Sequence, residues 1–300
     1  MSLLWFFLAL GAAITNSWVQ TVQKFAVNFS RYSKFTISFI AATLTSLMLF
    51  AVSYFVFGMP DIKEGFWTAV SITGILNAVT LPVMLKAYEI GEFSSVYSMI
   101  LMSPVFLLLT SFLFLGEVPT ALGVLGVALT ASGLMVISRS KGIGEKSANF
   151  KNGNILGLFV AAIWSVSVNF DKLSAKYSNV FFAPAVTFAY IALISAVYLL
   201  WKYKSLFIEI PDGKILKESG LLNIRRVSII LLLGFLMVIS QYFHNAALLA
   251  GPASYTIAVK RTGILWGVIW GWMFFRENNI SRKFLGALTA VAGVLAILFA

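Results

Sequence analysis

The chain has 300 residues, of which 60% are hydrophobic and 11% are charged, and its mean hydropathy is +0.92. Soluble domains carry about 25% charged residues, so this composition excludes a soluble globular protein. The chain has no cysteine and one histidine, which excludes disulfide scaffolds, thiol nucleophiles and multi-histidine metal sites. We therefore expect an integral membrane protein that carries no cofactor and no metal.

Long uncharged apolar runs predict membrane-spanning helices. A spanning helix needs roughly 20 apolar residues, and in lipid a helix satisfies its own backbone hydrogen bonds. Between the fifth and sixth runs, Arg139–Asn154 is predicted to be a linker, and Lys202–Arg226 is predicted to lie at the membrane surface. The ten predicted spans are Ser2–Gln23, Phe35–Phe57, Phe66–Leu85, Ser94–Leu115, Thr120–Ser138, Ile155–Phe170, Val180–Trp201, Val227–Leu249, Ser254–Phe275 and Phe284–Ala300.

The later spans of the two halves align without a gap when one is shifted by 160 residues. Lys24 and Lys172, at the ends of spans one and six, match more weakly. Five duplicated helices are an odd number, so the second copy enters the membrane from the opposite side. We predict an all-α membrane protein with ten transmembrane helices in two inverted five-helix repeats, residues 1–148 and 149–300. The aligned pairs are Ala87/Ala247, Gly91/Gly251, Ser94/Ser254, Phe114/Phe274, Glu117/Glu277, Gly126/Gly286 and Gly133/Gly293.

The basic residues indicate an orientation. Loops after odd-numbered spans hold 17 lysines and arginines, whereas loops after even-numbered spans hold three. Cytoplasmic loops are enriched in these residues, so we expect the odd-numbered loops to be cytoplasmic and both termini to lie outside. The net charge of +11 is then a topology signal, and no nucleic-acid partner is expected. The predicted location is the cell (inner or plasma) membrane, as a multi-pass protein.

The ends of the two halves carry a recognisable pattern. Each has a helix that begins with small residues, an apolar helix that ends in Gly116-Glu117 or Arg276-Glu277, and a glycine-rich final helix. Ala161–Lys172 adds a tryptophan-containing first helix, although Asn16 stands at the matching tryptophan position of span one. Together these features resemble EamA-type permeases of the drug/metabolite transporter superfamily, over nearly the whole chain.

The resemblance implies a central substrate cavity lined by spans four and nine. Family cargoes include amino acids, sugars, nucleotide-sugars, phosphorylated sugars and drugs, so the resemblance does not name the substrate. Many family members are drawn with both termini inside, which disagrees with the charge pattern. Glu117 and Glu277, at span ends, are expected to be helix caps or ion-pair partners, for example with Arg276.

Lys260 and Arg261 are predicted to bind substrate, because they lie roughly 10 Å along span nine. Charge within a bilayer is costly and usually functional. The planar fork of Arg261 suits a phosphate or carboxylate, and Lys260 adds a compact charge. The pair is also similar, locally, to a Lys-Arg pair that holds phosphate in plastid sugar-phosphate translocators. The alternative is that both side chains snorkel to lipid headgroups.

Other polar residues in the spans complete the predicted substrate site. Gln241 and His244 lie on one face of span eight, where helix–helix hydrogen bonding is the alternative role. His244 could also relay a proton, although the sequence identifies no partner for it. The remaining predicted lining residues are Ser94, Tyr97 and Ser98 of span four, Asn77 of span three, Asn16 of span one and Trp164 of span six.

The leading hypothesis is a secondary permease that moves a small polar, anionic metabolite by alternating access. The expected partners are that substrate, membrane lipids and a coupling proton or counter-substrate. The alternatives are a lipid or headgroup flippase and a proton-coupled exporter of cationic drugs. A cationic-drug exporter needs a buried carboxylate, and all eleven acidic residues are predicted to lie in loops or at span ends. No nucleophile–histidine pattern or pair of mid-span carboxylates suggests an enzyme.

Overall fold

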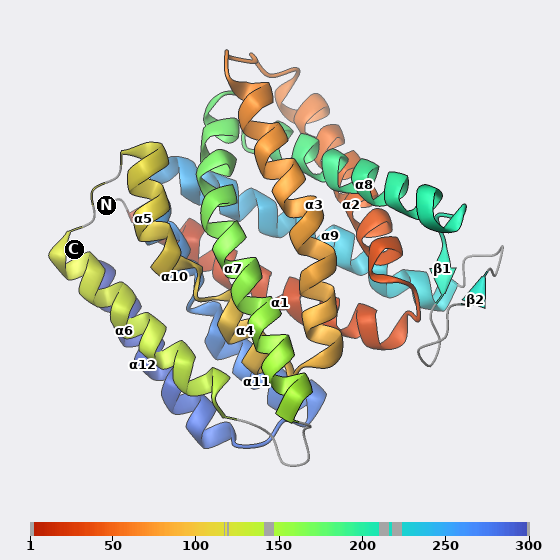
Figure 1. The fold of residues 1–300 in the computed structure, drawn as a ribbon. Coiled ribbons are helices and arrows are strands. Elements are labelled where there is room, and N and C mark those ends of the chain that lie inside the picture. Colours follow the sequence, from red (N-terminus) through yellow and green to blue (C-terminus); the bar gives the residue numbers. More distant parts are fainter. Residues whose placement is uncertain are drawn as a thin grey trace.

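The computed structural model describes residues 3–116, 118, 120–140, 147–209, 216–217 and 224–298. Within these residues the chain is almost entirely helical (Figure 1). The first half contains α1 (Leu3–Phe29), α2 (Lys34–Val52) with a π-helical extension η1 (Ser53–Phe57), α3 (Phe66–Ile90), α4 (Phe93–Ile100), α5 (Ser103–Leu115) and α6 (Ala121–Ser138).

The second half repeats this order of helices and adds one short hairpin. The predicted surface segment contains two-residue strands that pair antiparallel, with Ile208 opposite Lys217. The elements are α7 (Ser147–Lys176), α8 (Phe182–Tyr203), β1 (Ile208–Glu209), β2 (Leu216–Lys217), α9 (Ile224–Ala250), α10 (Ala253–Lys260), α11 (Gly263–Phe275) and α12 (Ile280–Leu298).

Seven helices in the described part of the chain are long and apolar enough to cross a membrane. The number becomes eight if the bent segment formed by α4 and α5 counts as one span. The chain is therefore a multi-pass, all-helical membrane protein. The seven are Leu3–Phe29, Lys34–Phe57, Phe66–Ile90, Ala121–Ser138, Lys151–Lys176, Phe182–Tyr203 and Val227–Ala250.

Predicted spans four and nine are each broken into two helices, which corrects the expectation of continuous spans. At both breaks the backbone forms tighter i to i+3 hydrogen bonds, from Met102 N to Met99 O (3.1 Å) and from Thr262 N to Val259 O (3.0 Å). Pro104 lies in the first turn of α5, where a proline is tolerated but continuation of the preceding helix is not. The first break therefore coincides with a proline that cannot continue α4.

Several predicted boundaries were also wrong, since α1 continues to Phe29 and α3 to Ile90, beyond the predicted ends at Gln23 and Leu85. Helix α7 begins at Ser147 and not at Ile155, and it continues to Lys176 instead of ending at Phe170. The predicted linker is correspondingly shorter, and its residues 141–146 lie outside the described part of the chain. The longer α7 has consequences for the site described below.

The helices pair in a reciprocal pattern. Helix α1 packs along α9 as α3 packs along α7, and α2 packs against α8 as α6 packs against α12. In Figure 1 the α6–α12 pair lies along one edge of the bundle and the α2–α8 pair on the opposite side. Helices α1, α2, α3 and α6 take the places in the first half that α7, α8, α9 and α12 take in the second. With this correspondence, the α1–α9 contact is the counterpart of the α7–α3 contact. The α2–α8 and α6–α12 contacts each join a helix to its own counterpart.

The crossing of α6 and α12 is close because glycines lie on both sides. A Cβ atom added to Gly286 would come within 2.7 Å of the carbonyl oxygen of Gly133, and one added to Gly293 within 2.5 Å of that of Gly126. Residue numbers rise along one helix as those of its partner fall, so the two helices run antiparallel. Gly133 therefore faces Gly286, the counterpart of Gly126, and Gly126 faces Gly293, the counterpart of Gly133. Two helices related by a two-fold axis would pair in this way.

A lysine forms a hydrogen bond with the backbone at the C-terminal end of α3 in the first half and of α9 in the second. Lys24 of α1 donates to the carbonyl oxygen of Gly91 (2.8 Å), and Lys172 of α7 donates to that of Gly251 (3.0 Å). Basic groups are favourable at helix C-termini, where carbonyl oxygens lack backbone partners. The weak match between Lys24 and Lys172 in the sequence therefore corresponds to a shared structural role.

Candidate functional site

A cavity with about 700 Å³ of empty space, open solvent included, lies among α1, α3, α7, α8, α9 and α10. Seven of the ten residues predicted to bind substrate line it. Lys260 and Arg261 are among them, so both cations face the cavity. The seven are Asn16, Asn77, Trp164, Gln241, His244, Lys260 and Arg261.

The three predicted residues of α4 lie outside this cavity. Tyr97 is completely buried and its hydroxyl accepts a hydrogen bond from Asn16 Nδ2 (3.3 Å). The hydroxyl of Ser98 donates to the carbonyl oxygen of Ser95 (2.7 Å). The backbone N–H of Ser94 donates to Glu277 Oε1 (3.0 Å). Of the three, Tyr97 contacts a residue of the cavity lining, through its hydrogen bond with Asn16.

Arg261 is the most unusual charge in the cavity. Its side chain lines the cavity, yet the residue is only 3% exposed. The guanidinium of Arg261 donates to the hydroxyl of Ser103, so a hydrogen bond connects the break before α11 with the break before α5. The Nε atom of Arg261 has no hydrogen-bond partner. Among the described residues, no carboxylate forms an ion pair with it. Its positive charge is therefore not balanced by a direct partner.

Asp171 is a carboxylate in the cavity wall that sequence reasoning missed. It lies on α7, beyond the predicted end of span six at Phe170 but within the observed helix. The expectation that every acidic residue lies in a loop or at a span end was therefore wrong, because α7 continues for more than a turn past Asp171. The weak repeat contained a signal, since aligning Lys24 with Lys172 pairs Asp171 with Gln23, which lines the adjoining cavity described below.

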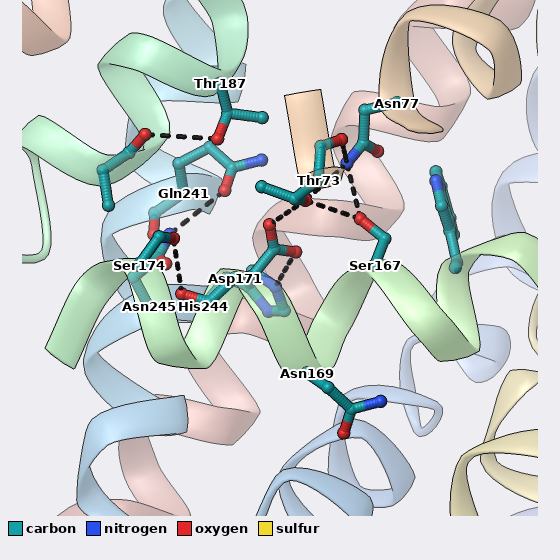
Figure 2. A network of polar contacts seen from close by, with 12 residues as sticks. Thr73, Asn77, Ser167, Asn169, Asp171, Ser174, Thr187, Gln241, His244 and Asn245 are labelled. Atoms are coloured by element: carbon teal, nitrogen blue, oxygen red, sulfur yellow. Dashed lines mark hydrogen bonds and ion pairs between the residues drawn. The ribbon is translucent and has the colours of Figure 1, made fainter. Parts of the chain in front are cut away.

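A chain of hydrogen bonds from α3 ends on Asp171 (Figure 2). Thr73 Oγ1 donates to Asp171 Oδ1 (2.5 Å) and lies 2.6 Å from the hydroxyl of Ser167, which in turn accepts from Asn77 Nδ2 (2.7 Å). Because Thr73 uses its proton on the carboxylate, Ser167 must donate to Thr73. Every donor in this chain is thus directed toward Asp171.

A second chain reaches Asp171 from α9 and α10. Lys260 Nζ lies 3.4 Å from His244 Nδ1, and His244 Nε2 lies 3.7 Å from Asp171 Oδ2. The partner of His244 that the sequence could not identify is therefore Asp171. Figure 2 shows the imidazole directly beneath the carboxylate. The two chains join α3, α7, α9 and α10 at one acidic group.

An adjoining cavity of about 460 Å³ shares six lining residues with the first but contains no charged residue in its lining. Its additional polar groups are Gln20, Gln23 and Ser240. The shared residues form the boundary between a charged compartment and a neutral one. They are Asn16, Asn77, Trp164, Phe188, Ile191 and Gln241.

A buried ion-pair cluster lies where α4 begins. Lys283, completely buried, pairs with Glu92 and with Glu277 (3.1 Å). Glu277 also accepts from the N–H of Ser94, in the first turn of α4, and so caps that helix as expected. Its cationic partner is Lys283 and not Arg276. The corresponding Glu117 lies outside the described residues.

Comparison with known proteins agrees with this architecture. The model of the EamA-like transporter family matches residues 3–139 and 151–299. The chain is 28% identical over 200 residues to the pseudopaline exporter CntI of Pseudomonas aeruginosa, from strains UCBPP-PA14 and PAO1, and the match covers 65% of this chain. It spans only 62% of the length of these curated relatives.

Similarity to a solved structure supports the fold alone. A protein of known crystal structure superposes with a TM-score of 0.71 at 13% identity, covering 97% of this chain and 96% of that one. The family match covers nearly the whole chain, in two segments of similar length. The chain therefore belongs to the EamA-like transporter family.

Proposed function

We propose that this protein is a permease for a small polar solute that carries a carboxylate or phosphate group. Arg261 binds that group in the cavity, with Lys260 beside it. The observation that carries the proposal is the guanidinium of Arg261, which is buried, faces the cavity and has no carboxylate partner among the described residues.

The energetic reason is the cost of burying an unbalanced charge. An ion removed from water costs several kcal/mol unless a counter-charge or hydrogen bonds replace the lost hydration. Ser103 supplies one acceptor, and Nε lacks one. An oxyanion would supply the missing charge and acceptors, and the arginine fork can bind it through two parallel hydrogen bonds.

The membrane arrangement is part of the proposal. We take α4 with α5 and α10 with α11 as single broken spans, which with the other helices gives ten spans in two inverted repeats, residues 1–148 and 149–300. The antiparallel crossing of α6 and α12 and the reciprocal helix pairs support a two-fold relation. Rocking of one repeat against the other would expose the cavity to each side in turn.

The orientation and direction of transport follow from charge and similarity. The excess of basic residues in odd-numbered loops supports a cytoplasmic location for those loops in the cell membrane. The relative from Pseudomonas aeruginosa is named an exporter, so we take the direction to be outward.

Asp171 favours a second candidate, a proton-coupled exporter of organic cations. Such a protein needs a carboxylate in the cavity that binds cation and proton alternately, and Asp171 lies in the cavity wall. Against this role, Thr73 already donates to Asp171, and both Lys260 and Arg261 would repel a cation.

Ligand-dependent thermal stability of the purified protein distinguishes the candidates, because a ligand that binds the folded state stabilises it by an amount that grows with the ratio of ligand concentration to Kd. The ligands are glucose 6-phosphate, citrate, glutamate, pseudopaline and the cationic dye ethidium. The proteins are the wild type, Arg261→Gln and the control Arg139→Gln, which changes an exposed arginine at the end of α6.

We expect one or more anions to stabilise the wild type and Arg139→Gln but not Arg261→Gln. Equal stabilisation of all three proteins by every active anion would overturn the assignment of Arg261. Stabilisation by ethidium alone, lost in Asp171→Asn, would establish the cation exporter. Stabilisation only by phosphatidylglycerol vesicles would indicate a headgroup site.

A further inference from the structure

We infer, on the basis of the permease proposed above, that His244 takes up a proton together with the anionic substrate. The inference concerns the group that couples protons to transport. It depends on the position of one imidazole between a lysine and a carboxylate.

The geometry assigns the resting state of the imidazole. An ammonium group can only donate hydrogen bonds, so the 3.4 Å approach of Lys260 Nζ makes His244 Nδ1 the acceptor. The proton of the neutral ring is then on Nε2, which faces Asp171 Oδ2 at 3.7 Å. Lys260 and Asp171 thus select one tautomer of His244.

Protonation of His244 would change both contacts. A proton on Nδ1 turns the acceptor into a donor that repels the ammonium of Lys260, whereas the imidazolium attracts Asp171 more strongly than the neutral ring does. Lys260 would then be released from His244 and could bind an anion held by Arg261. The added charge also makes the cavity more positive, so proton and anion would each favour binding of the other.

The charged groups around His244 lie on α7 and at the end of α10. They are Asp171 on α7, and Lys260 and Arg261 at the end of α10. Lys172 of α7 is bound to the carbonyl oxygen of Gly251 at the end of α9. Of the other helices along α9, α1 contributes only the neutral Asn16 to the lining of this cavity, and α2 contributes none.

Sulfate is a suitable probe because it remains a dianion over the range in which an imidazole titrates. We would measure its affinity by thermal shift between about pH 8 and about pH 5.5 for the wild type, His244→Gln and Arg261→Gln. We expect the affinity for sulfate to rise about tenfold as pH falls, a change equivalent to one pKa unit. The rise should be absent from His244→Gln, which retains hydrogen-bonding groups but takes up no proton.

The chain offers a second readout that needs no substitution, because it contains one histidine. Histidine-selective ¹⁵N labelling, without a histidine tag, gives one imidazole whose two nitrogen shifts report tautomer and protonation. At high pH we expect the Nε2–H tautomer. At an intermediate pH, sulfate should move the signals toward the doubly protonated ring.

The outcomes separate the two proposals. Sulfate that fails to bind the wild type, or that binds Arg261→Gln equally well, contradicts the anion site itself. Sulfate that needs Arg261 but binds with the same affinity at every pH contradicts proton coupling alone. An Nδ1–H tautomer, or protonation that sulfate leaves unchanged, contradicts the role of His244 even if His244→Gln does not fold.

Discussion

The broken helix pairs α4–α5 and α10–α11 have the same helix lengths but carry different side chains at the break. Each consists of an eight-residue helix, a two-residue break and a 13-residue helix, and the second copy lies 160 residues after the first. At the break the first copy has Ile100 and Leu101, whereas the second has Lys260 and Arg261. The break itself thus recurs in both halves, and the charges at this position belong to the second.

The starts of α4 and α10 provide a second comparison. Where α4 begins, Glu92, Lys283 and Glu277 form a buried ionic cluster. In the first turn of α10 the structure describes a hydrogen bond between neutral groups, the hydroxyl of Tyr255 and Thr120. Substitutions at equivalent positions should therefore have unequal effects, and the comparison can be tested in order of their size.

The largest loss of stability is expected from Lys283→Met. Removal of one partner from a buried ionic group costs about 3–5 kcal/mol, because the opposite charges stay buried. Here Glu92 and Glu277 would both lose the ammonium. The free energy of unfolding in detergent–SDS mixtures measures the effect, with the exposed neighbour Arg282→Met as control. Equal values for the two variants would show that the cluster is not structural.

Arg261→Met should reduce transport and stabilise the empty protein. Loss of a buried charge contact costs about 2–5 kcal/mol in binding, so we expect transport in proteoliposomes to fall by about 100-fold. The ligand-free protein should gain about 1–3 kcal/mol, because a buried group without a full set of partners is removed. Leu101→Met, at the equivalent break, should change neither quantity by as much. A variant that loses stability and transport together would indicate a structural arginine.

Gly133→Leu tests the close crossing of α6 and α12, where the two halves meet. The side chain would be forced against the backbone of α12 at Gly286 and Ala290, and overpacking of this kind costs about 1–3 kcal/mol. Val124→Leu enlarges an exposed residue of the same helix and should have little effect. If both variants unfold like the wild type, the close crossing of α6 and α12 does not hold the halves together.

The smallest effect is expected from Tyr255→Phe. The hydroxyl lies 3.2 Å from Thr120 N and 3.1 Å from its Oγ1, and one neutral hydrogen bond contributes about 1 kcal/mol. This loss of unfolding free energy should be clearly smaller than that of Lys283→Met. A loss as large would remove the difference between the starts of α4 and α10.

The predicted duplication and the seven predicted residues that line the cavity rest on patterns that a sequence can show without coordinates. Glycines recurring in register mark places where backbones touch, and Gln241 and His244 share a helix face. The break after Arg261 could not be predicted in the same way. A proline signals the first break, but only Thr262 and Gly263 mark the second.

Two further features needed the structure. The serines of α4 are polar and near the predicted site, but sequence spacing does not give the rotation of a short helix about its axis. Asp171 was missed because hydropathy ended span six at the first charge, whereas packing against α3 and α9 continues the helix to Lys176. A charge paired across helices can stay inside a span, and pairing across helices is not visible in one sequence.

The electrostatic sign of the cavity tests the central claim most directly. The chain has no cysteine, so Thr187→Cys in the charged cavity and Met237→Cys in the neutral one can each be modified with anionic or cationic methanethiosulfonate reagents. Positive potential raises the local concentration of anions. We expect the anionic reagent to be favoured at position 187 relative to position 237, by about tenfold, and this preference to disappear when Arg261→Met is added. Faster reaction of the cationic reagent at position 187, with Arg261 intact, would contradict an anion site.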